Sequence, residues 1–197
     1  MDDVVEDDPE NMSACAYCGV FRRDVLSRYA EQLDADKLLT GHNLDDEAET
    51  ALMNFIEGDI TKMSRQFDAS LGPFDGSDSA QTRTEPEEFI PRAKPLRDVP
   101  EKEVALYVHL RDLPSHMREC PHSDESFRGE IQELLYELED RHPGTRHSIR
   151  AGYERLAALA ASATDDSDGM VECQECGQPT TGDRCRACSL LDALEAV

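Results

Sequence analysis

Seven cysteines are the residues of this chain best suited to chemistry, and four of them form two CxxC pairs near the C-terminus. These pairs are Cys173 with Cys176 and Cys185 with Cys188. Four thiolates in a tetrahedral array satisfy Zn²⁺, and a segment this short has no core with which to fold without a metal. We predict a structural zinc ribbon here, against the alternative of unrelated cysteines. Zinc ribbons bind both proteins and nucleic acids, so this prediction alone assigns no function.

The other three cysteines are the CxxCG pair Cys15 and Cys18, and Cys120, which precedes Pro121. The pair can belong to a zinc site completed by two further ligands, or form a redox-active dithiol. Alternatively, three thiolates can hold a [4Fe-4S] cluster and leave the fourth iron open for an exogenous sulfur. Spacing alone leaves these three interpretations open.

Polar residues that suit a ligand site follow a short apolar run, in the sequence Gly41-His42-Asn43-Leu44-Asp45-Asp46. One interpretation is local: Asn43 caps a helix, and the acids favour its positive end. In the other, the Asp46 carboxylate holds Mg²⁺ on ATP or acts on a substrate. We name Gly41 and His42 as candidate ATP contacts, since ligands of parallel α/β proteins bind where strands end.

Two arginines, Arg22 and Arg23, follow Cys18 by about one helical turn. They are either solvated charges or groups that approach an anionic substrate. The helix that would carry them shows Phe21, Val25, Tyr29 and Leu33 at four-residue spacing, which predicts one apolar packing face.

The surrounding elements predict an α/β fold with a parallel sheet. After the first helix we expect a buried strand over 37–40, a polar loop, and a helix stopped by Gly58. Helix, strand, loop and helix in this order form the repeating unit of a parallel α/β sheet. A surface loop over 70–88, a short strand over 89–91 and further helices follow. These helices start at Pro100, at a cap on Ser123 and after Gly144.

The charge of −23, from 20 basic and 43 acidic residues, indicates adaptation to high salt, especially as only four residues are lysine. In such a composition the acidity no longer excludes nucleic-acid partners. No apolar run approaches the roughly 20 residues of a membrane span, so we expect no membrane partner. We expect a cytoplasmic protein whose cysteines bind metal.

Four motifs, ACAYCGVFRR, TGHNLDDEAET, ECPHSDESFRGE and the terminal CxxCG…CxxC, occur in the order found in one family. The chain resembles the tRNA 2-thiolation (TtuA- and NcsA-type) PP-loop sulfurtransferases over nearly its whole length. The resemblance implies part of a PP-loop ATPase fold, a Rossmann-like α/β domain with a parallel sheet. The implied divisions are an acidic lead-in (1–13), the C-terminal half of that domain (14–122), a helical extension (123–161), a linker (162–170) and a zinc ribbon (171–191).

The resemblance also implies an archaeal enzyme that replaces the 2-oxygen of a tRNA uridine by sulfur, using ATP with Mg²⁺. It implies a [4Fe-4S] cluster on Cys15, Cys18 and Cys120, with Asp46 and Arg22 in catalytic positions. Its partners would be tRNA and a ubiquitin-like sulfur carrier protein, and a homodimer is common in the family. Wobble and T-loop enzymes share these motifs, so the uridine is left open.

Two departures from the family pattern affect these expectations. Arg22 stands where members can carry a catalytic Lys, and an arginine cannot donate or accept that proton. The chain also has no SGGKDS-like PP-loop, so we expect a truncated or split chain that is inactive alone unless another chain supplies that half. The competing hypothesis is a non-catalytic zinc-ribbon adaptor that binds RNA or protein.

Overall fold

The computed structural model describes residues 4, 9–58, 63, 90–116, 120–122, 126–163 and 171–195. These residues fall into two compact units. The first unit comprises residues 1–38, 82–91 and 166–197 of the chain, and the second comprises 39–81 and 92–165. The loop expected over 70–88 and the Ser123 cap lie outside the described residues.

Helix α2 (Ala14–Gln32) begins in the first unit at Ser13, whose side chain accepts a hydrogen bond from the Ala16 N–H. Its fully buried large side chain is Tyr17, which is 0% exposed. The predicted apolar face is wrong for three of its four members, because α2 packs through a different side that includes Phe21. The exposed members are Val25, Tyr29 and Leu33, at 48%, 61% and 76%.

The C-terminal module of the same unit is a short hairpin followed by a helix. Strand β3 (Val171–Glu172) pairs antiparallel with β4 (Pro179–Thr180). Between the strands, Gly177 adopts a φ of 75°, a left-handed conformation that glycine reaches without a Cβ penalty. Helix α8 (Arg186–Glu195), which the sequence patterns did not predict, follows and contacts α2.

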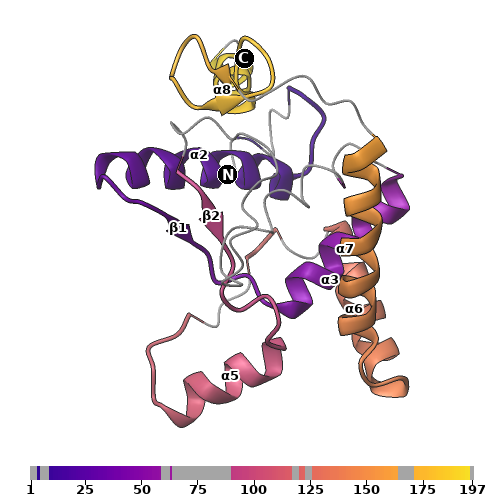
Figure 1. Cartoon of the computed structure of the whole chain (residues 1–197). Helices are drawn as coiled ribbons and strands as arrows, with labels where there is room; N and C mark the ends of the chain where they lie inside the picture. The colour runs from indigo at the N-terminus through magenta and orange to yellow at the C-terminus, as the bar shows by residue number, and fades with distance from the viewer. Residues whose placement is uncertain are drawn as a thin grey trace. The chain divides into compact units, whose positions relative to one another are not determined.

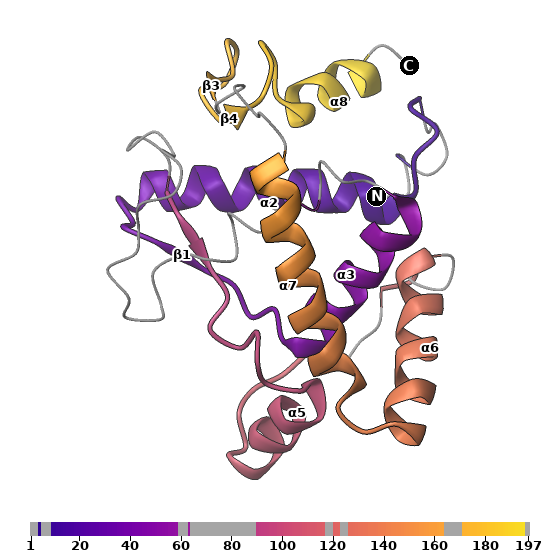
Figure 2. The same ribbon diagram turned by 45° about the vertical axis from the view of Figure 1, so that its right-hand side comes forward.

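Strands β1 (Leu38–Leu39) and β2 (Arg92–Ala93) form a small sheet, seen beside each other in Figures 1 and 2. The Leu38 N–H donates to the Pro91 carbonyl at 2.9 Å, and the Thr40 N–H donates to the Ala93 carbonyl at 3.0 Å. Donors and acceptors thus advance in the same direction, as in a parallel pair. The expected parallel α/β architecture is confirmed, but the second strand covers 92–93 rather than the predicted 89–91. Leu39 is 55% exposed rather than buried.

Helix α3 (Leu44–Glu57) starts and stops where the sequence predicts. Asn43 and Asp46 form a capping box, in which each side chain bonds the other residue's backbone N–H. At the other end Gly58 takes a φ of 67°, the left-handed C-cap that a side chain would strain.

The core of the second unit lies between α3, α6 (Phe127–Arg141) and α7 (Thr145–Ala163), which run side by side in Figures 1 and 2. Ala48, Ile131 and Leu135 are its buried centre. The N-cap of α6 is Ser126 rather than the predicted Ser123, because the Ser126 hydroxyl accepts from the Gly129 N–H.

Helix α5 (Glu101–Leu110) precedes these helices and has no buried residue. Pro100 occupies its N-cap, as expected from the sequence. Within the described residues, no helix is long and apolar enough to cross a membrane.

Candidate functional sites

The four C-terminal cysteines converge on one point. Their Sγ atoms all lie within 4.8 Å of one another. The Cys176–Cys185 and Cys173–Cys188 Sγ separations are 3.6 and 4.0 Å. A tetrahedron with Zn–S bonds of about 2.3 Å has edges of about 3.8 Å, between these two values. The thiolates therefore fit a single zinc ion, whereas a four-iron cluster would have to lie between them and force them further apart.

Backbone N–H groups favour the thiolate form of Cys173 in this site. Burial raises the pKa of the Cys173 thiol, but backbone N–H groups, including that of Cys185 at 3.2 Å, lower it to about 6. Burial and shared hydrogen bonds with neighbouring thiols instead raise the pKa of Cys176 and of Cys188. Protons thus hold the sulfurs together where a divalent cation would replace them.

Cys15 and Cys18 lie in the first turns of α2, where Cys15 is exposed and Cys18 is partly buried. Arg22, one turn later, donates from Nη2 to the Cys18 sulfur at 3.3 Å. The guanidinium thus places a positive charge beside the sulfur of a candidate metal ligand. The structure therefore joins two of the predicted site residues, Cys18 and Arg22, by a direct contact.

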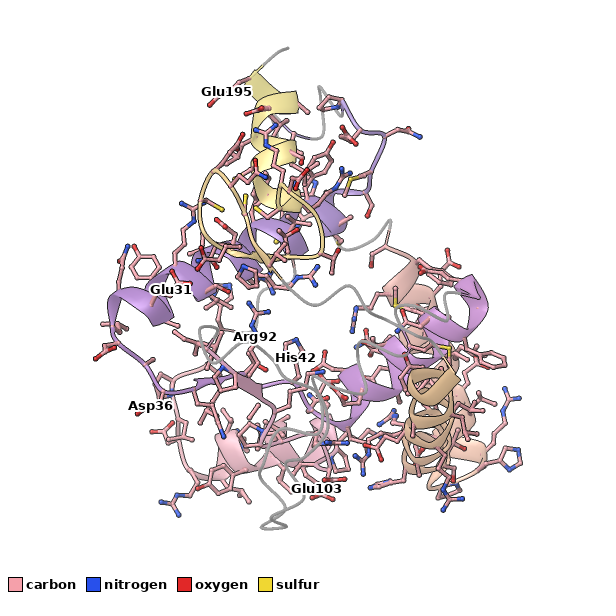
Figure 3. The ribbon with its side chains drawn as sticks, turned by 45° about the horizontal axis from the view of Figure 1, so that its top comes forward. Glu31, Asp36, His42, Arg92, Glu103 and Glu195 are labelled. Carbon is pink, nitrogen blue, oxygen red and sulfur yellow. The ribbon has the colours of Figure 1, made fainter. Side chains whose placement is uncertain are left out.

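The start of α3 gathers the polar residues predicted at the strand-to-helix corner, and Figure 3 labels His42 there. The His42 Nδ1 lies 2.8 Å from the Thr40 hydroxyl. Loss of water around the imidazole lowers the pKa of His42, against the opposing effect of the Asp46 carboxylate. Asp46 Oδ2 accepts from the Asn43 N–H at 3.0 Å, so the predicted capping role is real. The capping leaves Asp46 Oδ1 for other contacts.

Arg128 supplies that other contact from the first turn of α6. Its Nη1 lies 3.6 Å from Asp46 Oδ1 and 2.7 Å from Glu49 Oε2. Its Nη2 donates to the Thr50 hydroxyl at 3.1 Å. The guanidinium therefore spans the first two turns of α3 and compensates two of its carboxylates.

Glu49 makes the stability of the second unit depend on pH. It is 3% exposed. Burial raises its pKa from 4.5 to about 6, although Arg128 opposes the shift. Between these values the folded chain holds a proton that the unfolded chain has lost, so stability falls as pH rises through the window. Relative to Glu49→Gln, we expect the native chain to lose about 1 to 2 kcal/mol between about pH 4 and pH 7, allowing for solvent screening.

Urea unfolding of both proteins across this pH range, at constant high salt, measures the difference. Glu137→Gln is the matched control. Because the Glu137 side chain is 67% exposed, the difference in unfolding free energy between this variant and the native chain should not change with pH. The prediction would be contradicted if the unfolding free energies of Glu49→Gln and the native chain also differed by the same amount at every pH.

Sequence reasoning missed three residues of the α3 site, namely Arg128, Glu49 and Lys94. Lys94 Nζ bonds Glu47 Oε1 at 2.5 Å from just beyond β2. Arg128 belongs to the motif ECPHSDESFRGE, so the signal for it was present, but its partners on α3 are 78 and 79 residues away. Nothing local in the sequence predicts such a contact.

For the remaining predicted residues the structure gives position and exposure. Gly41 precedes His42 and leaves open space where a Cβ would be. Cys120 is exposed and belongs to the second unit, whereas Cys15 and Cys18 belong to the first. The three-cysteine cluster therefore stays a prediction.

The fold and the cysteine geometry define an α/β protein with a C-terminal four-cysteine module whose sulfurs could hold one metal ion. The chain matches no protein-family model. It is 64% identical over 200 residues to the tRNA 2-thiolation protein NcsA of Haloferax volcanii. The aligned region covers all of this chain and 60% of that protein. It is 37% identical to the cytoplasmic tRNA 2-thiolation protein 1 of Schizosaccharomyces pombe, in an alignment that covers 91% of this chain and 50% of that protein.

A solved structure extends these similarities to three dimensions. The U34-tRNA thiolase NcsA from Methanococcus maripaludis, with its [4Fe-4S] cluster, matches at a TM-score of 0.69 and 36% identity. The match covers 91% of this chain and 52% of that one. The chain is homologous to tRNA 2-thiolation proteins along nearly its whole length, and it spans about half to 60% of the length of these relatives.

Proposed function

We propose that the chain is part of an ATP-dependent tRNA-uridine 2-sulfurtransferase. The observation that carries this proposal is the 64% identity to a tRNA 2-thiolation protein along the whole chain. It is supported by the fold match to a U34-tRNA thiolase that has a [4Fe-4S] cluster. The zinc-ribbon adaptor is not favoured, because an adaptor would need only the four C-terminal cysteines and not the other three motifs.

Cys15, Cys18 and Cys120 are the proposed cluster ligands. A cluster held by three thiolates offers one iron with an open position for an exogenous sulfur. Arg22 contacts the Cys18 sulfur, so its positive charge lies beside a proposed cluster ligand and would attract an anionic substrate group. Because a guanidinium keeps its proton at neutral pH, Arg22 acts here by charge rather than by proton transfer.

Asp46 is the proposed catalytic carboxylate of the second unit. The capping box fixes one of its oxygens, and Arg128 faces the other, so the carboxylate is oriented before any substrate binds. Gly41 and His42 are the proposed ATP contacts, with Mg²⁺ on the nucleotide. Cys173, Cys176, Cys185 and Cys188 are the proposed ligands of a structural zinc ion.

The proposed partners are tRNA, a ubiquitin-like sulfur carrier, and either a second copy of this chain or a different chain that carries a PP-loop. We propose a cytoplasmic location, in line with the names of several relatives. The acidic composition suits a high-salt cytoplasm, as expected for a relative of a Haloferax protein.

Metal analysis after anaerobic reconstitution tests the proposal. We expect about four irons and one zinc per native chain, and loss of the iron with retention of the zinc in Cys120→Ala. His142→Ala removes another exposed metal-binding side chain of the second unit and should keep both metals. Zinc alone in every protein, or full iron in Cys120→Ala, would contradict the assigned cluster.

A further inference from the structure

The residues of helix α2 fall on two opposite sides of the helix, one with the Cys15–Cys18 pair and one that packs on the four-cysteine module. With about 100° between successive residues, the cysteine pair falls on one stripe with an arginine and three exposed apolar side chains. The members of this stripe are Cys15, Cys18, Arg22, Val25, Tyr29 and Leu33. The opposite side carries Tyr17, Val20, Phe21, Asp24, Arg28 and Glu31.

The opposite side of α2 is the one that holds the four-cysteine module. Val20 and Phe21 pack against the cluster formed by the module's buried cysteines and Ala187. At the far end of the helix, Gln178 is 5% exposed and its Nε2 donates to Glu31 Oε1 at 2.6 Å. Figure 3 labels Glu31 on α2. The module therefore contacts the helix over more than two turns.

A charge contact accompanies this packing. Arg28 bonds Asp24 at 2.9 Å, and this bond is the main reason that its pKa is raised. The nearby Cys176 and Cys188 sulfurs add to the same effect. A metal held by four thiolates carries a net negative charge, so a guanidinium at this place would stabilise the loaded module on the helix.

The module and the helix each lack a core of their own. The module has two two-residue strands, and its buried side chains are three of the four proposed metal ligands with Ala187, Leu190 and Gln178. In α2 the buried residues are Tyr17 and Ala30. Helices depend on tertiary packing for most of their stability. Among the described elements, α8 of the module is the one that α2 contacts most extensively.

We propose that the metal-loaded module is a brace that positions α2, and with it the Cys15–Cys18 pair on the opposite side. Phe21 on the helix and Gln178 on the module are then positioning residues for the pair, since each joins the two parts and neither is a proposed metal ligand. The zinc site acts on the cysteine pair through the helix between them. The part of this inference that concerns an iron–sulfur cluster rests on the proposed function, whereas the bracing itself does not.

Hydrogen exchange of the zinc-loaded, iron-free chain tests the brace. We expect zinc removal by a chelator under reducing conditions to speed amide exchange in residues 19–32 by at least about 10-fold, because α2 loses its packing partner. Exchange in α3 and α6 of the second unit should change less than about 2-fold, since these helices have their own core.

Two aromatic residues of the same helix provide a matched pair of variants. Phe21→Ala should reproduce the faster α2 exchange while one zinc stays bound, because it removes the contact and not a ligand. Tyr29→Ala makes a similar truncation on the exposed side and should leave exchange unchanged. If Phe21→Ala fails to fold, Gln178→Ala with the chelation experiment answers the same question.

The brace would be overturned if zinc removal freed the amides of 171–195 while those of 19–32 kept their protection. It would also be overturned if Phe21→Ala and Tyr29→Ala behaved alike. The experiment contains no iron, so its outcome is separate from that of the reconstitution. A braced helix in a chain that binds no iron would leave the module's role intact and refute the proposed sulfurtransferase chemistry.

Discussion

Asp45→Asn is expected to lower the free energy of unfolding of the second unit by about 3 to 5 kcal/mol. Asp45 Oδ1 bonds Arg146 Nη1 at 2.6 Å, and both side chains are only 5% exposed. Removing the carboxylate charge leaves the arginine buried without compensation. Unfolding in urea, followed by circular dichroism at constant salt, measures the change.

The loss should spread beyond one contact because the ion pair joins several helices. Asp45 Oδ2 also accepts from the Glu101 N–H at the start of α5. Arg146 lies 4.7 Å over the Tyr136 ring, and the Tyr136 hydroxyl donates to Glu101 Oε2 at 2.6 Å. The network thus links the first turn of α3 to α5, α6 and α7.

Two controls separate the buried charge from other effects. Glu137→Gln breaks the exposed pair with Arg141 and should cost less than about 1 kcal/mol. The double variant Asp45→Leu/Arg146→Met removes both buried charges and should recover most of the stability lost in Asp45→Asn. A double variant as unstable as the single one would show that the penalty has another origin.

Cys176→Ala is expected to weaken zinc binding by at least about 100-fold. Structural zinc sites bind with an apparent free energy of about 10 to 16 kcal/mol, so one of four ligands accounts for about 3 kcal/mol. Because the module has few other buried side chains, β3, β4 and α8 should lose their order together with the metal.

Competition with a chromophoric chelator measures the zinc affinity, and circular dichroism reports the accompanying loss of α8. Cys120→Ala is the control, because this thiol lies in the second unit and should leave the zinc affinity unchanged. Equal affinities in Cys176→Ala and the native chain would remove Cys176 from the ligand set. A lower affinity is also expected on acidification, since protons compete for the thiolates.

The α3 site and the four-cysteine module were predictable because their signals are local in the chain. A cap such as Asn43 and a stop such as Gly58 act on backbone groups within one turn, so they can be read from neighbouring residues. The two CxxC pairs likewise place four sulfurs on two short turns, which need only to face each other. At α6 the N-cap is Ser126, and because several serines precede this helix, local chemistry alone does not select one of them.

The apolar stripe on α2 shows where local reasoning failed. Periodicity shows that residues share one side of a helix, but it does not show what covers that side. Val25 and Tyr29 are periodic and exposed, whereas Phe21 reaches the module only because the chain returns about 150 residues later. Helix α8 was also left unpredicted, although its apolar residues Ala187, Leu190, Leu191 and Leu194 recur at helical spacing.

By itself the sequence determined the resemblance to tRNA 2-thiolation proteins, the cysteine groups, the parallel α/β architecture and the capped start of α3. These follow from motif order and from contacts within a few residues. Only the tertiary structure decided that Arg128 and Glu49 join Asp46, that Arg146 compensates Asp45, and that the module packs behind the Cys15–Cys18 pair. Each of these contacts joins residues far apart in the chain, and burial, which sets their strength, exists only once the helices have packed.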